Sequence, residues 1–241
     1  MDRLAEDARL VLLNATCFKA DWTLPFDAAA TTLRAFKLES SDPAISVPMM
    51  SLTASFRYAS RRNAQVIELP YGRNGAISMI VVLPLLESGL AGFEKSLTVE
   101  GWEDLAGEVS KAEPHRGLMV LPKIEFSYAT SLRPALSKLG AARAFSDDAQ
   151  FGEPSSKPAG LSEVLQKTFL AVTEKGTEAA AVTVVTTRTN SSPQLRPARV
   201  AFTMVVDRPY FFAVVEKTTR AVLFLGSIRQ PEGGMRPERQ E

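Results

Sequence analysis

The sequence predicts an α+β fold that is rich in strands and has few helices. Short runs of β-branched and aromatic residues, bounded by turn residues, recur along the chain, and each run predicts a strand. Several runs are apolar at every position, which is typical of strands that are buried on both faces. Stretches with the spacing of an amphipathic helix are short and few.

The strand pattern falls on seven segments, and two pairs of them have the spacing of hairpins. The predicted strands cover residues 10–18, 64–69, 77–83, 117–126, 164–173, 210–215 and 221–228. Asn74 and Gly75 end the turn between the second and third segments, and these residue types tolerate positive φ. Residues 216–220 form a similar link between the last two segments.

Helices are predicted in three places. Their spacing covers residues 90–97, 99–109 and 132–139. Gly140 follows the third helix, where glycine is a common C-terminal cap. None of these helices is long, so the strands dominate the predicted fold.

Charge and composition exclude several classes of function. The 28 basic and 27 acidic residues nearly cancel, which removes the electrostatic reason to expect a nucleic acid or a membrane as partner. Cys17 is the only cysteine and His115 the only histidine, so we expect no disulfide, no metal site and no cofactor. The sequence contains no nucleophile elbow, phosphate-binding loop or zinc-protease motif. We therefore expect that the chain is not an enzyme.

Residues 177–187 break the local pattern. The segment reads TEAAAVTVVTT, with helix formers first, β-branched residues afterwards, and neither proline nor glycine. As a strand, it would have small uncharged side chains on the face that begins with Thr177, and Glu178 and Arg188 on the other face. An exposed strand of this kind is an aggregation hazard, which indicates that the fold has a place to insert it. An ordinary strand that continues residues 164–173 is the alternative.

Several short motifs occur in a fixed order along the chain. Residues 174–181 read EKGTEAAA, and residues 10–22 read LVLLNATCFKADW. The other motifs are PFD at 25–27, VPMMSLTASF at 47–56, ELPY at 68–71, SMIVVLP at 78–84, LPK at 121–123, LG at 139–140, AFS at 144–146, DRPY at 207–210 and LFLG at 223–226. In these motifs and their order the chain resembles the serpin family, from about Leu10 to Pro231. The segment 174–181 is similar to the serpin hinge EEGTEAAA, with one change at Lys175.

The resemblance implies a multi-domain serpin fold over residues 1–231, with three β-sheets, a few helices and an exposed reactive loop at about residues 176–199. The N-terminal helices and two central-sheet strands of the family have no counterpart in this chain, which resembles the C-terminal portion of a serpin. Residues 232–241 are polar and glycine-rich, and we expect them to form a disordered tail.

The resemblance also implies inhibition of a protease by suicide-substrate trapping. The protease attacks the loop and forms an acyl-enzyme, and the cleaved loop inserts into the central sheet between residues 10–18 and 164–173. Distortion of the oxyanion hole then stalls deacylation. The implied partner is a serine protease, with a cysteine protease as the alternative. The family default is an extracellular location, and because the first residues lack a signal-peptide pattern, the cytoplasm is the alternative.

The resemblance assigns residues to the hinge and to the reactive bond. The hinge consists of Glu174, Gly176, Thr177, Glu178, Ala179, Ala180 and Ala181. Family spacing from Gly176 places the reactive bond between Asn190 and Ser191. Arg188 and Thr189 are the alternates for the residue before the cut.

A third group of residues matches the region where the serpin central sheet opens. It consists of Asn14, Trp22 and Gln166. Gln166 stands where many serpins have a histidine that hydrogen-bonds the asparagine matched by Asn14. A glutamine amide can both donate and accept, so it can replace that contact.

Three other interpretations stay open. The first is a serpin-fold protein that does not inhibit, such as a carrier, chaperone or storage protein, although the small uncharged hinge face argues against it. The second is a hydrolase that uses only carboxylates, but no paired-carboxylate motif supports it. The third is an inactive fragment, or a β-rich binding module that donates or accepts a strand.

Overall fold

The computed structural model describes residues 10–39, 43–146, 148–149, 151, 160–177 and 200–231 of the chain. The chain divides into two compact units. Unit 1 comprises Met1–Phe18 and Phe126–Leu170, and unit 2 comprises Lys19–Glu125 and Ala171–Glu241. A single domain over residues 1–231 stays a prediction.

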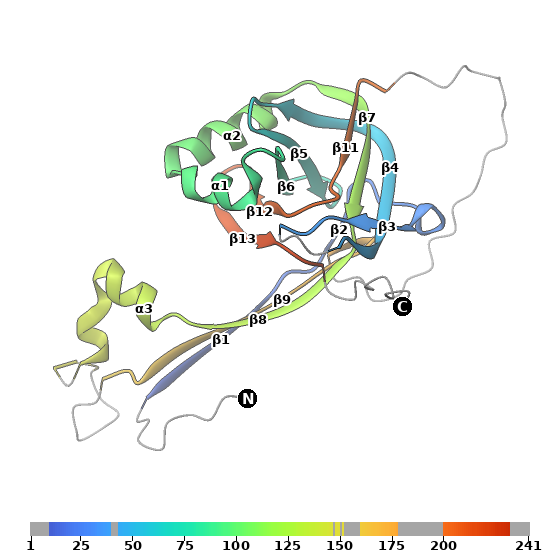
Figure 1. The fold of residues 1–241 in the computed structure, drawn as a ribbon. Helices are drawn as coiled ribbons and strands as arrows, with labels where there is room; N and C mark the ends of the chain where they lie inside the picture. The colour runs from blue at the N-terminus through green and yellow to red at the C-terminus, as the bar shows by residue number, and fades with distance from the viewer. Residues whose placement is uncertain are drawn as a thin grey trace, which may run out of the picture. The chain divides into compact units, whose positions relative to one another are not determined.

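Unit 1 is built on long paired strands. Its elements are β1 (Val11–Cys17), most of β8 (Ile124–Ser131), most of β9 (Glu163–Val172), and the helical segments α3 (Arg133–Leu136), η2 (Ser137–Ala141) and η3 (Ala142–Phe145). β1 runs parallel to β9, in a register that extends from Val11 opposite Glu163 to Cys17 opposite Phe169 (Figure 1). β8 pairs with β9 as well. Gly140 has a φ of 101° inside η2, in keeping with its predicted role at a helix end.

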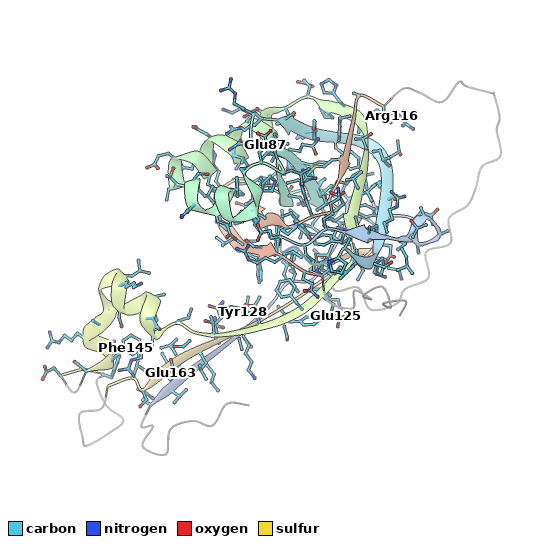
Figure 2. The ribbon with its side chains drawn as sticks, in the orientation of Figure 1. Glu87, Arg116, Glu125, Tyr128, Phe145 and Glu163 are labelled. Carbon is cyan, nitrogen blue, oxygen red and sulfur yellow. The ribbon has the colours of Figure 1, made fainter. Side chains whose placement is uncertain are left out.

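Apolar side chains of unit 1 are exposed on both faces of β1. Leu12 and Leu13 are consecutive, so their side chains point to opposite faces, and they are 49% and 74% exposed. Tyr128 on β8 is 59% exposed, and Figure 2 shows it among the side chains that stand out from these strands. Among the described residues, therefore, neither face of β1 is covered.

Unit 2 contains one eight-stranded sheet, in the strand order β11, β7, β4, β5, β6, β12 and β13, with β3 paired to β4. Its strands are β3 (Thr32–Phe36), β4 (Ile45–Ser60), β5 (Ala64–Tyr71), β6 (Ile77–Pro84), β7 (Pro114–Pro122), β11 (Phe202–Val205), β12 (Tyr210–Glu216) and β13 (Val222–Ile228). Two short strands, β2 (Ala20–Asp21) and β10 (Gly176–Thr177), pair with each other outside this sheet. The 3-10 helix η1 covers Ala28–Ala30.

The core of unit 2 lies between this sheet and two helices, α1 (Gly89–Ser96) and α2 (Val99–Lys111), which cover one face of it (Figure 1). The Thr98 hydroxyl caps α2, because it accepts a hydrogen bond of 3.0 Å from the Gly101 amide. Beneath the helices, the rings of Phe93 and Trp102 both contact Phe211 on β12. The helices thus bury the apolar strands that the sequence pattern predicts.

All seven predicted strand segments contain strand. Segment 117–126 is divided, because β7 ends at Pro122 and β8 begins at Ile124. β5, β6 and β12 are buried at nearly every position, as their apolar character predicts. In the first hairpin, Gly75 has the predicted positive φ, but its partner is Gly72 rather than Asn74. The sequence pattern did not predict the strands β3, β4 and β11.

The α+β class is confirmed, with one difference from the three sheets that the resemblance implied. In unit 2 hydrogen bonds join all eight strands into one sheet. The reason is β4, which is 16 residues long. Its first part pairs with β3, its last four residues pair with β5, and Met49–Arg57 pairs with β7. A single long strand therefore connects two sets of neighbours.

None of the helices in the described ranges has the length and apolar character that crossing a membrane requires.

Candidate functional site

Gly176 and Thr177 of the hinge form the short strand β10 within unit 2. β10 runs antiparallel to β2, with Gly176 opposite Asp21 and Thr177 opposite Ala20. On its other side, Thr177 pairs antiparallel with Val172, the last residue of β9. β10 therefore lies between the end of β9 and β2, in the strand order β9, β10, β2.

At Gly176 two backbones approach closely. A Cβ atom added to Gly176 would lie 2.1 Å from the carbonyl oxygen of Ala20 and 2.6 Å from the Cα of Asp21. Both are backbone atoms, which cannot rotate away, so the position requires glycine. The Gly176 carbonyl oxygen also accepts hydrogen bonds from the Thr173 amide at 2.8 Å and from the Thr173 hydroxyl at 3.0 Å. These bonds close the turn that reverses the chain after β9.

Thr177 is held in place by Tyr71. The Thr177 side chain is fully buried, and its hydroxyl shares a hydrogen bond of 2.7 Å with the Tyr71 hydroxyl. Burial raises the pKa of Tyr71 far above its ordinary value, an effect that the hydrogen bond to Thr177 only partly opposes. The phenol therefore stays protonated at physiological pH. Trp22 stacks on the Tyr71 ring, with 4.3 Å between the ring centroids and 13° between the planes.

Glu174 is bound by a cation and a hydroxyl. Its Oε2 lies 2.9 Å from Nζ of Lys123, and its Oε1 accepts a hydrogen bond of 2.8 Å from the Thr31 hydroxyl. Partial burial acts to raise the pKa of this carboxyl. The hydrogen bonds from Lys123, from its own backbone and from Thr31, together with the charge of Lys123, outweigh burial and hold the pKa below its ordinary value. Glu174 is therefore ionised at physiological pH.

Two residues after β2 hold the backbone that leads into the hinge. The Trp22 amide donates to the Lys175 carbonyl oxygen at 2.8 Å, and the Trp22 indole N–H donates to the Thr173 carbonyl oxygen at 2.9 Å. The Phe26 amide donates to the Glu174 carbonyl oxygen at 2.8 Å. Three successive carbonyl groups of the turn are thus hydrogen-bonded, which fixes the direction in which the chain enters β10.

The structure divides the predicted sheet-opening residues between the two units. Asn14 on β1 and Gln166 on β9 are register partners in unit 1. Within the part of the chain that the structure describes, no hydrogen bond joins their side-chain amides. Trp22 belongs to unit 2 and contacts the hinge.

The other predicted site residues are not described. Of the hinge, Glu178, Ala179, Ala180 and Ala181 lie outside the described residues. The same holds for the reactive-bond residues Asn190 and Ser191, for the alternates Arg188 and Thr189, and for the tail 232–241.

No pattern in the sequence assigned a role to three residues of this site, Tyr71, Lys123 and Thr31. Tyr71 and Lys123 stand in the motifs ELPY and LPK, which were noted only as part of the resemblance. Tyr71 is 106 positions away from Thr177 in the chain, so only the tertiary fold brings the two together. In the ranges that the structure describes, no group of three or more His, Cys, Asp and Glu side chains could hold a metal ion.

Comparison with known proteins gives consistent matches. A family model described as Serpin (serine protease inhibitor) matches residues 1–231. An uncharacterized serpin-like protein of Methanosarcina acetivorans is 32% identical over 231 residues, which cover 96% of this chain and 53% of the relative. Intracellular coagulation inhibitor 2 of Tachypleus tridentatus is 34% identical, over 92% of this chain and 53% of its own length. The chain spans about half the length of the curated relatives it matches.

Solved structures give the same result for the fold. The native-state structure of tengpin, a thermophilic serpin, matches with a TM-score of 0.78 and 27% identity. The match covers 95% of this chain and 58% of the tengpin chain.

Proposed function

This chain belongs to the serpin family, and we propose that it carries the reactive loop of a serine-protease inhibitor that traps its target as a suicide substrate. In this proposal the chain contributes the reactive loop to an inhibitor and does not catalyse. The loop covers about residues 176–199, and the protease cuts it between Asn190 and Ser191, with Arg188 and Thr189 as alternates. A cysteine protease is the second candidate target. We place the action outside the cell, as the family default suggests, with the cytoplasm as the alternative.

The position of β10 is the observation that carries the proposal. A loop that follows β9 through a tight turn and enters the sheet must run antiparallel to β9. Gly176 and Thr177 have that direction, and they pair with β2 on one side while Thr177 pairs with Val172 on the other. Both residues of β2 already pair with β10, so an extension of β10 by residues 178–187 would run antiparallel along the rest of β9 and along residues 11–19, which precede β2.

The pairing in unit 1 supports a gain of hydrogen bonds on insertion. β1 and β9 pair directly, from Val11 opposite Glu163 to Cys17 opposite Phe169. A strand inserted between them would replace one ladder by two. The extra ladder of roughly ten hydrogen bonds, at about 0.5–1.5 kcal/mol each, would contribute on the order of 10 kcal/mol. Since this is comparable with the stability of a whole domain, it is enough to distort the active site of a tethered protease.

The chemistry of the inserting face supports the same mechanism. Thr177, the first residue of that face, is fully buried, and its side chain carries no charge. The residues that follow on the same face, Ala179, Ala181 and Thr183, are small and uncharged. A face of this kind can enter a packed sheet without the desolvation cost of an ion. Insertion can then outpace deacylation, which is the condition for trapping.

Incubation with a panel of serine proteases tests the proposal, both for the full-length gene product and for residues 1–241. We expect the full-length product to form an SDS-stable complex with its target. Mass spectrometry of the released C-terminal peptide should give a new N-terminus at Thr189, Asn190, Ser191 or Ser192.

Two other results have different meanings. Cleavage at the same bonds without a stable complex would indicate a serpin-fold protein that does not inhibit. A dominant cut beyond Pro193 would show that the proposed register of the reactive bond is wrong.

A further inference from the structure

A cleft of about 180 Å³ in unit 2 lies next to the residues that hold the hinge. Most of its wall is apolar, and the buried side chains of Trp22, Phe26, Phe56 and Leu69 form part of it. A cavity of about 150 Å³ is sufficient to take up benzene. The cleft is therefore large enough for a single aromatic ring, and its wall suits one.

The charged side chains of the cleft are two cations and one carboxylate. Glu68 is buried, and its Oε1 accepts a hydrogen bond of 2.8 Å from the Ser78 hydroxyl and lies 2.5 Å from Nζ of Lys217. The side chain of Arg57 is 39% exposed and that of Lys217 is 36% exposed, whereas that of Glu68 is only 3% exposed. A molecule that enters the cleft therefore meets the cations first, and the three groups together leave one net positive charge.

The guanidinium of Arg57 has more N–H donors than its described contacts use. Its Nη1 donates to the Ala112 carbonyl oxygen at 2.6 Å, and its Nε lies 4.0 Å from Oε2 of Glu68, beyond hydrogen-bond distance. Within the described part of the chain, Oε2 of Glu68 has no hydrogen-bond partner. A guanidinium carries five N–H donors in a planar fork that matches a carboxylate. An exposed fork beside an apolar wall is suited to a molecule with a ring and an acid group.

We propose that this cleft binds a small aromatic carboxylate, with its ring against Trp22, Phe26 and Phe56 and its carboxylate on Arg57 and Lys217. The apolar wall contributes affinity, and the net positive charge selects an anion over a neutral or cationic compound of the same shape. None of the residues that line the cleft belongs to the proposed reactive loop, and the existence of the site does not depend on inhibition of a protease.

Occupancy of the cleft should also stabilise the turn at residues 173–176, where the hinge begins. Trp22 and Phe26 line the cleft, and their amides donate to the carbonyl groups of Lys175 and Glu174. A ring that holds these two side chains in place opposes opening of both hydrogen bonds. At a ligand concentration ten times the dissociation constant, the two amides should exchange with solvent about tenfold more slowly.

A matched set of probes tests the proposal on residues 1–241. Phenylacetate, benzyl alcohol and benzylammonium share one ring and differ in charge. In ligand-observed NMR titrations we expect phenylacetate to bind with a dissociation constant on the order of 1 mM. Benzyl alcohol should bind about tenfold more weakly, and benzylammonium more weakly still. Equal binding of phenylacetate and benzyl alcohol would overturn the proposal.

The location of binding needs a separate readout. The chain has two tryptophans, so Trp102→Phe leaves Trp22 as the only fluorophore of this kind. Phenylacetate should change the Trp22 emission with the same dissociation constant that NMR gives. An NMR-detected interaction without a change in Trp22 emission would place the ligand elsewhere and refute the site.

Arg57→Met should lower the affinity for phenylacetate by about tenfold and leave benzyl alcohol unchanged. The matched control is Arg61→Met, because Arg61 pairs with Glu108 and does not line the cleft. Circular dichroism checks that each variant folds. If Arg57→Met does not fold, Lys217→Met is tested in its place, because it also removes one cation from the cleft. This variant should reduce the preference for phenylacetate over benzyl alcohol. Unchanged preference in the folded variant would refute the proposal.

Discussion

The hydroxyl groups of Tyr71 and Thr177 lie 2.7 Å apart, and both side chains are buried. Because burial raises the pKa of Tyr71, its phenol stays protonated and the hydrogen bond persists over the physiological pH range. Trp22 stacks on the same ring, and its indole N–H donates to the carbonyl oxygen of Thr173 in the turn at residues 173–176. Thr177 is therefore held in place both by the hydrogen bond of its side chain and by the pairing of its backbone with β2 and β9.

Tyr71→Phe removes this hydrogen bond and keeps the aromatic ring. The Thr177 hydroxyl then loses its partner in a buried position, which should cost about 1–3 kcal/mol. We expect the loss to appear as faster amide hydrogen exchange at Thr177, with the stack on Trp22 preserved. Tyr58→Phe is the control, because the Tyr58 hydroxyl accepts a hydrogen bond from Gln65 away from the hinge. Equal acceleration at Thr177 in both variants would mean that the effect is not local.

Two glycine substitutions should have opposite effects on stability. Gly176→Ala places a Cβ against the backbone of Ala20 and Asp21, so β10 and β2 must separate, at a cost of about 1–3 kcal/mol.

Gly107 lies in α2 with no atom within 4 Å of an added Cβ. Gly107→Ala should therefore stabilise by about 0.5–1 kcal/mol, since alanine is the better helix former. Chemical denaturation measures both changes, and a neutral Gly176→Ala would contradict the close approach.

The sequence was informative where a pattern is local. Apolar runs predicted the buried strands β5, β6 and β12, and glycine predicted the interruption of the helical region at Gly140 and the turn at Gly75. It failed for β4, although Ile45, Val47 and Met49 alternate as buried residues. Pro48 and the many serines and threonines conceal that alternation, because such residues more often mark turns and edges.

The candidate site could be predicted only in part. The resemblance singled out Glu174, Gly176 and Thr177, but not the groups that bind them. Lys123, Thr31 and Tyr71 come from distant parts of the chain, and their contacts follow from how β-strands meet in unit 2. The cleft gave no signal in the sequence at all, because Arg57, Glu68 and Lys217 are ordinary charged residues until the fold brings them together.

The ion pair of Glu174 should make the turn at residues 173–176 sensitive to acid. Since the pKa of Glu174 is lowered in the folded state, its contribution is complete above the ordinary value of 4.5 and is lost as the pH falls through the lower folded value. We expect the protection factor of the Phe26 amide, which donates to Glu174, to decrease over that acidic range. In Glu174→Gln this decrease should be absent. Glu103→Gln, an exposed position on α2, is the control and should keep the decrease.

Thr177→Arg should convert the proposed inhibitor into a substrate. An arginine at this fully buried position would have to enter the sheet without a partner, at a cost of several kcal/mol. Insertion would then be slower than deacylation, and the protease would be released. Glu178→Arg is the control, because alternate residues of a strand point to opposite faces. The measurement is the number of inhibitor molecules consumed for each protease trapped, in the full-length gene product. Equal damage from both substitutions would remove the strand-insertion mechanism.

Residues 1–241 by themselves should associate in solution and should not inhibit. Among the described strands β1 pairs only with β9, so within the described part of the chain no strand covers its other edge from Val11 to Thr16, beside exposed Leu12 and Leu13. Leu13→Lys should reduce association, because a charge on an edge strand opposes pairing with a second copy. Leu139→Lys is the control, since Leu139 is 83% exposed but lies in the helical segment η2. The measurement is light scattering as a function of protein concentration. If the unmodified chain is a monomer, or if both lysine substitutions reduce association equally, the edge of β1 does not drive association.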